Sequence, residues 1–163
     1  MIFEERQRFR QWWAWGAILL PALIAWILFA LQILGGEPVG DDPMPDWAVW
    51  VFFVVMGLGF PVWFAVLTLE TTVDEEGVRV RFRNGIGRRD LDFGEIARVE
   101  VRTYRPLLEF GGWGLRWGGK GRRAFTASGN RGVDVALHDG RSVLIGSKRP
   151  EALAEAIRSR IVA

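Results

Sequence analysis

Two long uncharged stretches constrain the fold of this chain more than any other feature. Residues 12–34 and 47–69 each span 23 residues without a single Asp, Glu, Lys or Arg. A helix of that length rises about 35 Å, which is enough to cross a hydrocarbon layer about 30 Å thick. The connecting residues 35–46 are rich in Gly, Pro and Asp and are too few for a domain. We therefore expect a membrane α-hairpin (two transmembrane helices), with residues 35–46 as its outer loop.

The distribution of basic residues predicts the orientation of this hairpin. Of the 21 Lys and Arg residues, three precede residue 12, none lies in the loop and 18 follow residue 69. Lys and Arg beside a span stay on the cytoplasmic side during insertion. We therefore expect a multi-pass protein of the plasma (inner) membrane with both termini in the cytoplasm. A signal peptide is the alternative for the first stretch, but the apolar run exceeds the usual length of about 7 to 15 residues.

A small cytoplasmic domain is expected at residues 70–163, after a membrane unit at residues 1–69. Strands are predicted where the hydrophobic period is two, as at 78–83, where Val and Phe alternate with Arg. Asn84-Gly85 is a strong signal for a hairpin turn. A two-residue turn there pairs Arg79 with Asp90, which is a favourable pair of opposite charges.

Further strands and one helix are predicted toward the C-terminus. Residues 97–103 form one strand, and 133–137 with 142–146 form a second hairpin that turns at Asp139-Gly140. Pro150 suits the first turn of a short helix. That helix carries one apolar stripe, formed by Leu153, Ala156, Ile157 and Ile161. We expect it to dock on the open end of the sheet, which gives a small α+β soluble domain.

Four segments of the chain are similar to a known family. They are ERQRFRQWW (5–13), VRTYRPLLEFGGWGLRWG (101–118), SGNRGVDVAL (128–137) and LIGSKRPEALAEAI (144–157). The chain resembles an uncharacterised family of small prokaryotic two-span membrane proteins with a bacterial pleckstrin-homology-like domain. The resemblance implies an antiparallel β-barrel or sheet closed by a C-terminal helix, and it implies no activity. Arg149 departs from the pattern, because related domains often have a helix-capping Asp or Asn there.

Arginines of the soluble domain form the candidate binding surface. Residues 70–163 carry 18 basic against 13 acidic residues, an excess of five positive charges with His138 neutral. Each cation near an anionic leaflet gains about 1 kcal/mol. The candidate residues are Arg116, Lys120, Arg122 and Arg123, joined by Arg79, Arg81 and Arg83. Non-specific attraction to membrane lipids and specific recognition of a lipid headgroup are both left open.

Other chemical motifs in the chain are weaker. Residues 114–120 have the spacing of a phosphate-binding loop, but glycine replaces the Ser or Thr that ligates magnesium after the lysine. Catalysis would need a cleft that joins Asp134, His138 and Arg141. The carboxylates of the 35–46 loop lack the defined spacing of a cation site. We predict no catalytic residue, cofactor or metal site.

These patterns favour a non-enzymatic protein. Arginines alternate with Asp and Glu, which disfavours nucleic-acid binding, and neither apolar stretch holds the ionisable residues that ion or proton paths need. The leading hypothesis is an adaptor, scaffold or accessory subunit that displays a β-rich module to an unidentified membrane-protein partner. The alternative is sensing of anionic lipid headgroups by the basic face. Small residues at 14–25 and 57–61 would allow homo-oligomers to form through the helices.

Overall fold

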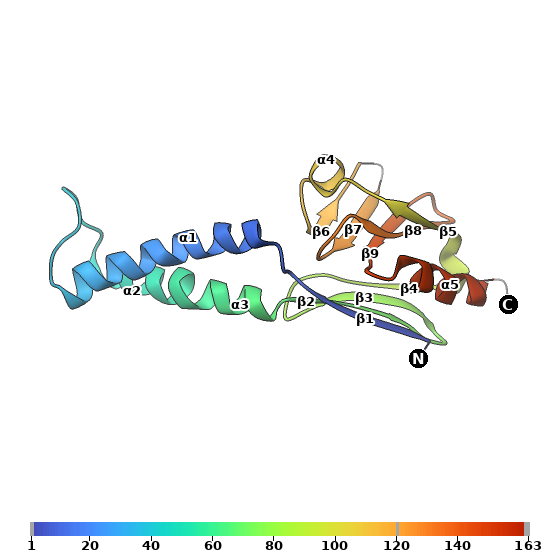
Figure 1. Ribbon diagram of the computed structural model, residues 1–163, viewed down its shortest axis with the longest axis horizontal. Coiled ribbons are helices and arrows are strands. Elements are labelled where there is room, and N and C mark those ends of the chain that lie inside the picture. Colours follow the sequence, from blue (N-terminus) through green and yellow to red (C-terminus); the bar gives the residue numbers. More distant parts are fainter. Residues whose placement is uncertain (1, 120, 162–163) are drawn as a thin grey trace. The chain divides into compact units, whose positions relative to one another are not determined.

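The computed structural model, which describes residues 2–119 and 121–161, divides into two units (Figure 1). The first unit, here called the helical hairpin, is the continuous segment Phe9–Val66. The second, here called the β unit, combines Met1–Arg8 with Leu67–Ala163. The β unit is therefore assembled from chain on both sides of the hairpin.

The helical hairpin consists of two helices that each continue through a stretch of wider, π-helical turns. The first is formed by α1 (Trp12–Leu28) and η1 (Phe29–Leu34), and the second by α2 (Asp46–Phe52), η2 (Phe53–Gly59) and α3 (Phe60–Val66). By length and composition, both helices can cross a membrane. Two apolar helices at the predicted positions are thus confirmed.

The second helix is shorter than its apolar sequence. The prediction of 47–69 was wrong at its C-terminal end, because the helix stops at Val66 and β2 (Thr68–Val73) begins two residues later. Leu69 is fully buried in β2, where it lies opposite Phe82 of one neighbouring strand and Gln7 of the other. Pairing on both sides of the strand outweighs continuation of the helix at these residues.

Small residues allow the two helices of the hairpin to approach closely, as the sequence predicts. Ala22 and Ala25 of α1 are buried, and a Cβ added at Gly57 would lie 3.5 Å from the Cβ of Ala25. The indole Nε1 of Trp26 donates a hydrogen bond to the Gly57 carbonyl at 3.2 Å. The large apolar side chains of the same helices mostly face outward.

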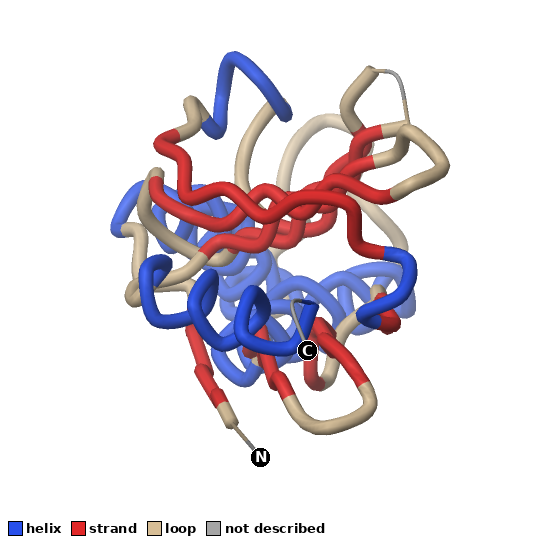
Figure 2. The backbone as a smooth tube through the Cα atoms, turned by 90° about the vertical axis from the view of Figure 1, so that its right-hand side faces the viewer, coloured by secondary structure: helices blue, strands red, loops and turns tan. Residues whose placement is uncertain are grey.

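The β unit contains two sheets rather than one closed barrel. The first sheet has the order β1-β2-β3-β4 and is antiparallel throughout, and the second has the order β5-β8-β9-β7-β6. The strands are β1 (Phe3–Arg8), β2 (Thr68–Val73), β3 (Gly77–Arg83), β4 (Arg88–Asp92), β5 (Ile96–Thr103), β6 (Gly114–Trp117), β7 (Arg122–Thr126), β8 (Arg131–Leu137) and β9 (Ser142–Gly146). Three short helices complete the β unit: η3 (Phe93–Glu95), α4 (Pro106–Phe110) and α5 (Pro150–Ile161). Figure 2 shows the two sheets as separate layers of strands.

The expected antiparallel barrel is wrong in two respects. β9 returns from the β8 hairpin into the space between β8 and β7, and it therefore runs parallel to β7. At the outer edge of the first sheet, β2 pairs with β1 from the N-terminus rather than with a strand that would close a barrel. The result is an open pair of sheets of mixed topology.

The register predicted for the Asn84-Gly85 hairpin is confirmed. Arg79 lies opposite Asp90 and Val78 opposite Leu91, as the Asn84-Gly85 turn requires. Asn84 has φ 58°, a left-handed conformation that asparagine tolerates better than most residues. The hairpin of β8 and β9 also forms, with Val135 opposite Val143. Period two and turn residues were therefore sufficient to place these strands.

The core lies between the sheets, and α5 covers its open end. Phe82 of the first sheet stacks on Phe125 of the second, with ring centroids 6.2 Å apart. α5 contacts β5 and β8 of the second sheet as well as β1 and β2 of the first. Leu153 and Ile157 of α5 are fully buried, which confirms the predicted apolar stripe.

The N-terminal strand β1 is an element that the sequence did not predict. Two of its three inner side chains are polar, the third being Phe3. Gln7 donates from Nε2 to the Gly146 carbonyl at 2.7 Å, and Glu5 accepts from the Ser147 hydroxyl at 2.5 Å. The backbone N–H of Lys148 also donates to Glu5 at 2.8 Å. Because buried positions of β1 hold polar side chains, the segment lacks the alternation of apolar and polar residues that predicts a strand.

Candidate interaction surfaces

The structure divides the seven predicted basic residues among different faces of the β unit. Arg79, Arg81 and Arg83 lie on β3 and point away from the core, because Val78, Val80 and Phe82 between them are buried. Arg116 and Arg122 share the outer face of the second sheet, and Arg123 is on the opposite face of β7. Lys120 lies outside the described residues. These arginines therefore do not form one surface.

The outer face of the first sheet is organised in rows that cross its strands. One row contains Arg8, Thr68 and Arg83, and the next contains Arg6, Glu70, Arg81 and Arg88. These two rows, here called the basic rows, combine five arginines with one glutamate. Arg6, Arg8 and Arg88 were not among the predicted residues, and the pairing of β1 and β4 with the β2–β3 pair is what brings them onto this face.

Glu70 is the shared carboxylate of the basic rows. It is buried, and it lies 2.9 Å from Arg81, 3.3 Å from Arg83 and 3.4 Å from Arg6. Burial acts to raise the pKa of Glu70, but hydrogen bonds and charge from Arg81 and Arg83, with the charge of Arg6, outweigh it and lower the pKa overall. One carboxylate thus neutralises part of three guanidinium charges, and the rows keep a positive excess.

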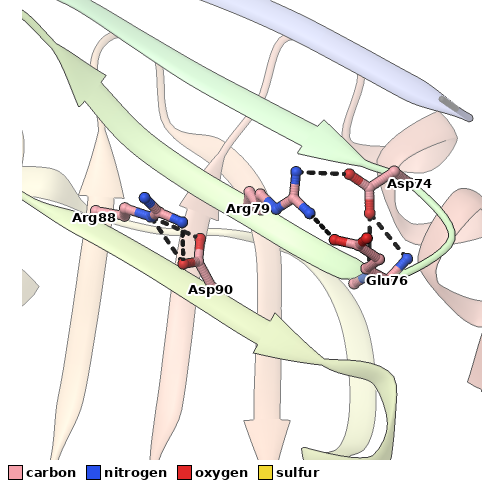
Figure 3. Close-up of polar contacts among 6 residues, drawn as sticks. Asp74, Glu76, Arg79, Arg88 and Asp90 are labelled. Atoms are coloured by element: carbon pink, nitrogen blue, oxygen red, sulfur yellow. Dashed lines mark hydrogen bonds and ion pairs between the residues drawn. The ribbon is translucent and has the colours of Figure 1, made fainter.

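The far end of the same face is acidic. The next row across the sheet holds Glu4, Arg79 and Asp90, and Asp92 follows it on β4. Arg79 forms ion pairs with Asp74, at 3.0 Å, and with Glu76 (Figure 3). We call Glu4, Asp74, Glu76, Asp90 and Asp92, with Arg79, the acidic end. Arg88 of the basic rows reaches Asp90 at 2.7 Å, so an ion pair joins the two regions (Figure 3).

Positive charge is concentrated where the chain connects to the helical hairpin. Only residues 9–11, which include Arg10, separate Arg8 from α1, and only Leu67 separates α3 from β2. The acidic end lies at the opposite ends of these strands. The outer face of the first sheet therefore carries a charge gradient along its strands. The strand ends that connect through the chain to the apolar helices are positive, and the opposite ends are acidic.

The outer face of the second sheet is built around a small aromatic cluster. Phe110 of α4 packs with Tyr104, Ala124 and Leu144, and the guanidinium of Arg122 lies 5.8 Å from the centre of the Phe110 ring. Burial raises the pKa of the Tyr104 hydroxyl to about 12, so it stays protonated at neutral pH. These contacts give Phe110 and Arg122 a packing role on this face.

The glycine-rich segment forms a β-hairpin rather than a phosphate-binding loop. β6 and β7 pair antiparallel on either side of it, with Arg116 opposite Ala124, whereas a phosphate-binding loop leads from a strand into a helix. The Nε of Arg116 donates to the carbonyl of Trp113 at 3.1 Å. Among residues 114–119 and 121–126, which the structure describes, this geometry gives no cradle of backbone N–H groups at the start of a helix.

The remaining candidate groups do not converge. Asp134 pairs with Arg102 at 3.3 Å, whereas Arg141 pairs with Asp139 at 2.5 Å. His138 is exposed at the β8–β9 turn, where its backbone N–H donates to the carbonyl of Glu95. Within residues 2–119 and 121–161, no three His, Asp or Glu side chains are grouped closely enough to hold a metal ion.

Comparisons with known proteins show the family to which this chain belongs. No curated protein matches this chain in sequence. One family model, described as a family of unknown function (DUF6141), matches residues 1–163, the whole length of the sequence. The chain therefore belongs to the DUF6141 family.

Proposed function

We propose that this protein is a non-enzymatic adaptor, scaffold or accessory subunit of the inner membrane. Its helical hairpin spans the bilayer, and its β unit, a pleckstrin-homology-like module, lies in the cytoplasm with both termini. The observation that carries the proposal is the way the two units are joined. β1 and β2 are neighbours in one sheet, and each connects to an apolar helix through three residues or fewer.

Such short connections hold the module close to the membrane. Only three residues, which reach about 10 Å when extended, separate Arg8 of the basic rows from the start of α1. Confinement of this kind raises the effective concentration of the module for any partner in the same membrane. The outward-facing apolar side chains of the hairpin suit hydrocarbon, and the arginines beside its ends favour the cytoplasmic side. α5, packed across the open end of both sheets, supports the pleckstrin-homology-like assignment.

Cross-linking in native membranes tests this function. The full chain is compared with a control in which an unrelated globular domain replaces the β unit on the same hairpin. We expect a membrane protein that is captured reproducibly with the full chain and lost with the control. Recovery of the same proteins with both chains, or of no reproducible protein, contradicts the adaptor function.

Sensing of anionic lipid is the second candidate function, and the charge gradient favours it. In this function, the negative charge of the lipid controls how the β unit is presented to its partner. The test measures partner recovery in nanodiscs of neutral and of anionic lipid, at low and at high salt. Recovery that depends on anionic lipid at low salt supports sensing, and equal recovery in all conditions contradicts it.

A further inference from the structure

The connection between β3 and β4 exposes an isoleucine. Ile86 has 88% of its surface accessible, which is more than any apolar side chain of the two apolar helices has. Its neighbours Asn84 and Gly87 take positive φ values of 58° and 122°, so the connection is a tight, defined turn. A branched apolar side chain held at the tip of such a turn gains nothing from the fold of the β unit itself.

A second exposed apolar side chain lies on the adjacent strand. Gly87 packs against β6, because a Cβ there would lie 2.8 Å from Leu115 and 3.6 Å from Phe125. Trp117 follows Leu115 by two residues, so both side chains leave β6 on the same face, and Trp117 is 67% exposed. The turn and the end of β6 therefore present an isoleucine and a tryptophan on neighbouring elements.

Arginines flank the turn that carries Ile86. Arg83 and Arg88 are the last residue of β3 and the first of β4, on either side of the turn, and more than half of each side chain is exposed. Arg8 occupies the same row as Arg83. In the described part of the chain, no carboxylate lies within 4 Å of Arg8. We call the set Arg8, Arg83, Ile86, Arg88 and Trp117 the docking edge.

The β3–β4 turn of the docking edge lies beside the residue that links α3 to β2. A side chain added at Gly85 would meet the side chain of Leu67, which is the single residue between α3 and β2. If α3 spans a bilayer, the β3–β4 turn is therefore within one or two residues' reach of the point where the chain leaves the lipid.

We infer that the docking edge binds the anionic surface of the membrane in which the hairpin is embedded, with Ile86 and Trp117 entering the headgroup layer. The inference rests on the proposed function, since it requires an inserted hairpin. Tryptophan favours the membrane interface, and arginine binds lipid phosphate through paired N–H donors. The acidic end, at the other end of the same strands, is repelled by anionic lipid, so the two regions orient the β unit together.

Site-specific fluorescence in nanodiscs tests this inference. The chain has no cysteine, so single variants can be labelled with a polarity-sensitive fluorophore. Ile86→Cys reports the docking edge, Glu75→Cys reports the exposed turn beside the acidic end, and Leu23→Cys reports insertion of the hairpin. The nanodiscs contain either neutral lipid alone or neutral lipid with about 30% anionic lipid. A quencher is attached either to the lipid headgroups or to the acyl chains.

The expected result is lipid quenching of the Ile86→Cys label in anionic nanodiscs, reduced by high salt, with the Glu75→Cys label unquenched. Adding Arg83→Gln or Arg88→Gln should weaken the docked state about fivefold per arginine. Arg98→Gln, an exposed position on β5, should have no effect. Quenching at Leu23→Cys without quenching at Ile86→Cys overturns the docking edge but not the proposed function. No quenching at Leu23→Cys overturns both.

A protein partner at this edge is the competing occupant, and the same samples distinguish it. Nanodiscs that contain the purified chain alone hold no native membrane-protein partner. Lipid docking would be overturned if the Ile86→Cys label is not quenched in these nanodiscs and position 86 cross-links to a protein in native membranes. Equal quenching of the Ile86→Cys label in neutral and anionic lipid would overturn the role of the arginines.

Discussion

The helical hairpin and the β unit distribute their side chains in opposite ways. In the hairpin, small residues such as Ala25 and Gly57 lie inside, while large apolar residues such as Leu23 face outward. In the β unit, large apolar residues such as Phe125 are buried, while arginines cover the outer faces. This contrast is what the proposed membrane hairpin requires, and under that proposal the same substitution should have different effects in each unit.

The largest effect is expected in the core of the β unit. Phe125→Ala removes a fully buried ring that stacks on Phe82, and it should destabilise the β unit by about 3–5 kcal/mol. Native-state hydrogen exchange of the β8 and β9 amides in the full chain measures this loss. Leu108→Ala, which truncates an exposed side chain on α4, is the matched control, and equal effects of the two would contradict the assignment of the core.

A charge on the outside of the hairpin should have the next largest effect. Leu23 is 56% exposed near the middle of the first helix, and Leu23→Arg should cost about 3 kcal/mol if that position faces hydrocarbon. The measurement is the fraction of the chain that resists alkaline extraction from membranes. Leu108→Arg makes the same exchange at a 78% exposed position of the β unit and should leave this fraction unchanged. If both variants behave alike, the contrast between the two units fails.

The polar contacts of β1 should have an intermediate effect. Gln7→Ala leaves the carbonyl of Gly146 without its donor and the hydroxyl of Ser128 without its acceptor, at a cost of about 1–3 kcal/mol. Hydrogen exchange of the β9 amides would report it. Arg8→Ala, one residue further along β1 but on the outer face, should change the exchange little. If Gln7→Ala leaves the hydrogen exchange of the β9 amides unchanged, the polar contacts of β1 do not hold the two sheets together.

The smallest effect is expected at Glu70, and it depends on pH. Because the pKa of Glu70 is lowered in the folded chain, its carboxylate stabilises the β unit at pH values above its ordinary pKa of 4.5. That contribution is lost as the pH falls through the lowered pKa. Glu70→Gln should therefore cost about 1 kcal/mol at pH 7, since its arginine partners are largely exposed.

Denaturation of Glu70→Gln and the unaltered chain across pH 7 to about 3 measures this dependence. The difference in free energy of unfolding between the two should shrink as the pH decreases below 4.5. A difference that is constant over this range would mean that the Glu70 carboxylate is not stabilised by its arginines.

The regular parts of the β unit could be predicted because local rules act there. The Asn84-Gly85 turn fixed the register of Arg79 with Asp90, and the apolar stripe with Leu153 and Ile157 identified α5. The apolar lengths of the hairpin helices were equally clear, except that Leu69 was assigned to a helix and lies in β2. Composition alone cannot decide between helix and strand for an apolar residue at the junction of a helix and a strand.

What could not be predicted depends on contacts between distant parts of the chain. β1 buries Glu5 and Gln7 against residues 146–148, so no hydrophobic alternation marks it. The parallel pairing of β7 with β9 likewise has no local signal. As a result, the predicted cluster of arginines mixed residues of opposite faces, and the basic rows with Arg6 and Arg8 became visible only once β1 was placed.

The central claim is that the hairpin crosses the membrane and leaves the β unit on the cytoplasmic side. Asp41→Cys in the loop and Glu155→Cys on α5 place single thiols on the two sides of that proposed arrangement. A membrane-impermeant thiol reagent is applied to cells whose inner membrane is intact and accessible. The account predicts that Asp41→Cys is labelled at once and Glu155→Cys only after the membrane is permeabilised. Labelling of Glu155→Cys in intact cells, or of both positions in a chain recovered from the soluble fraction, would contradict it.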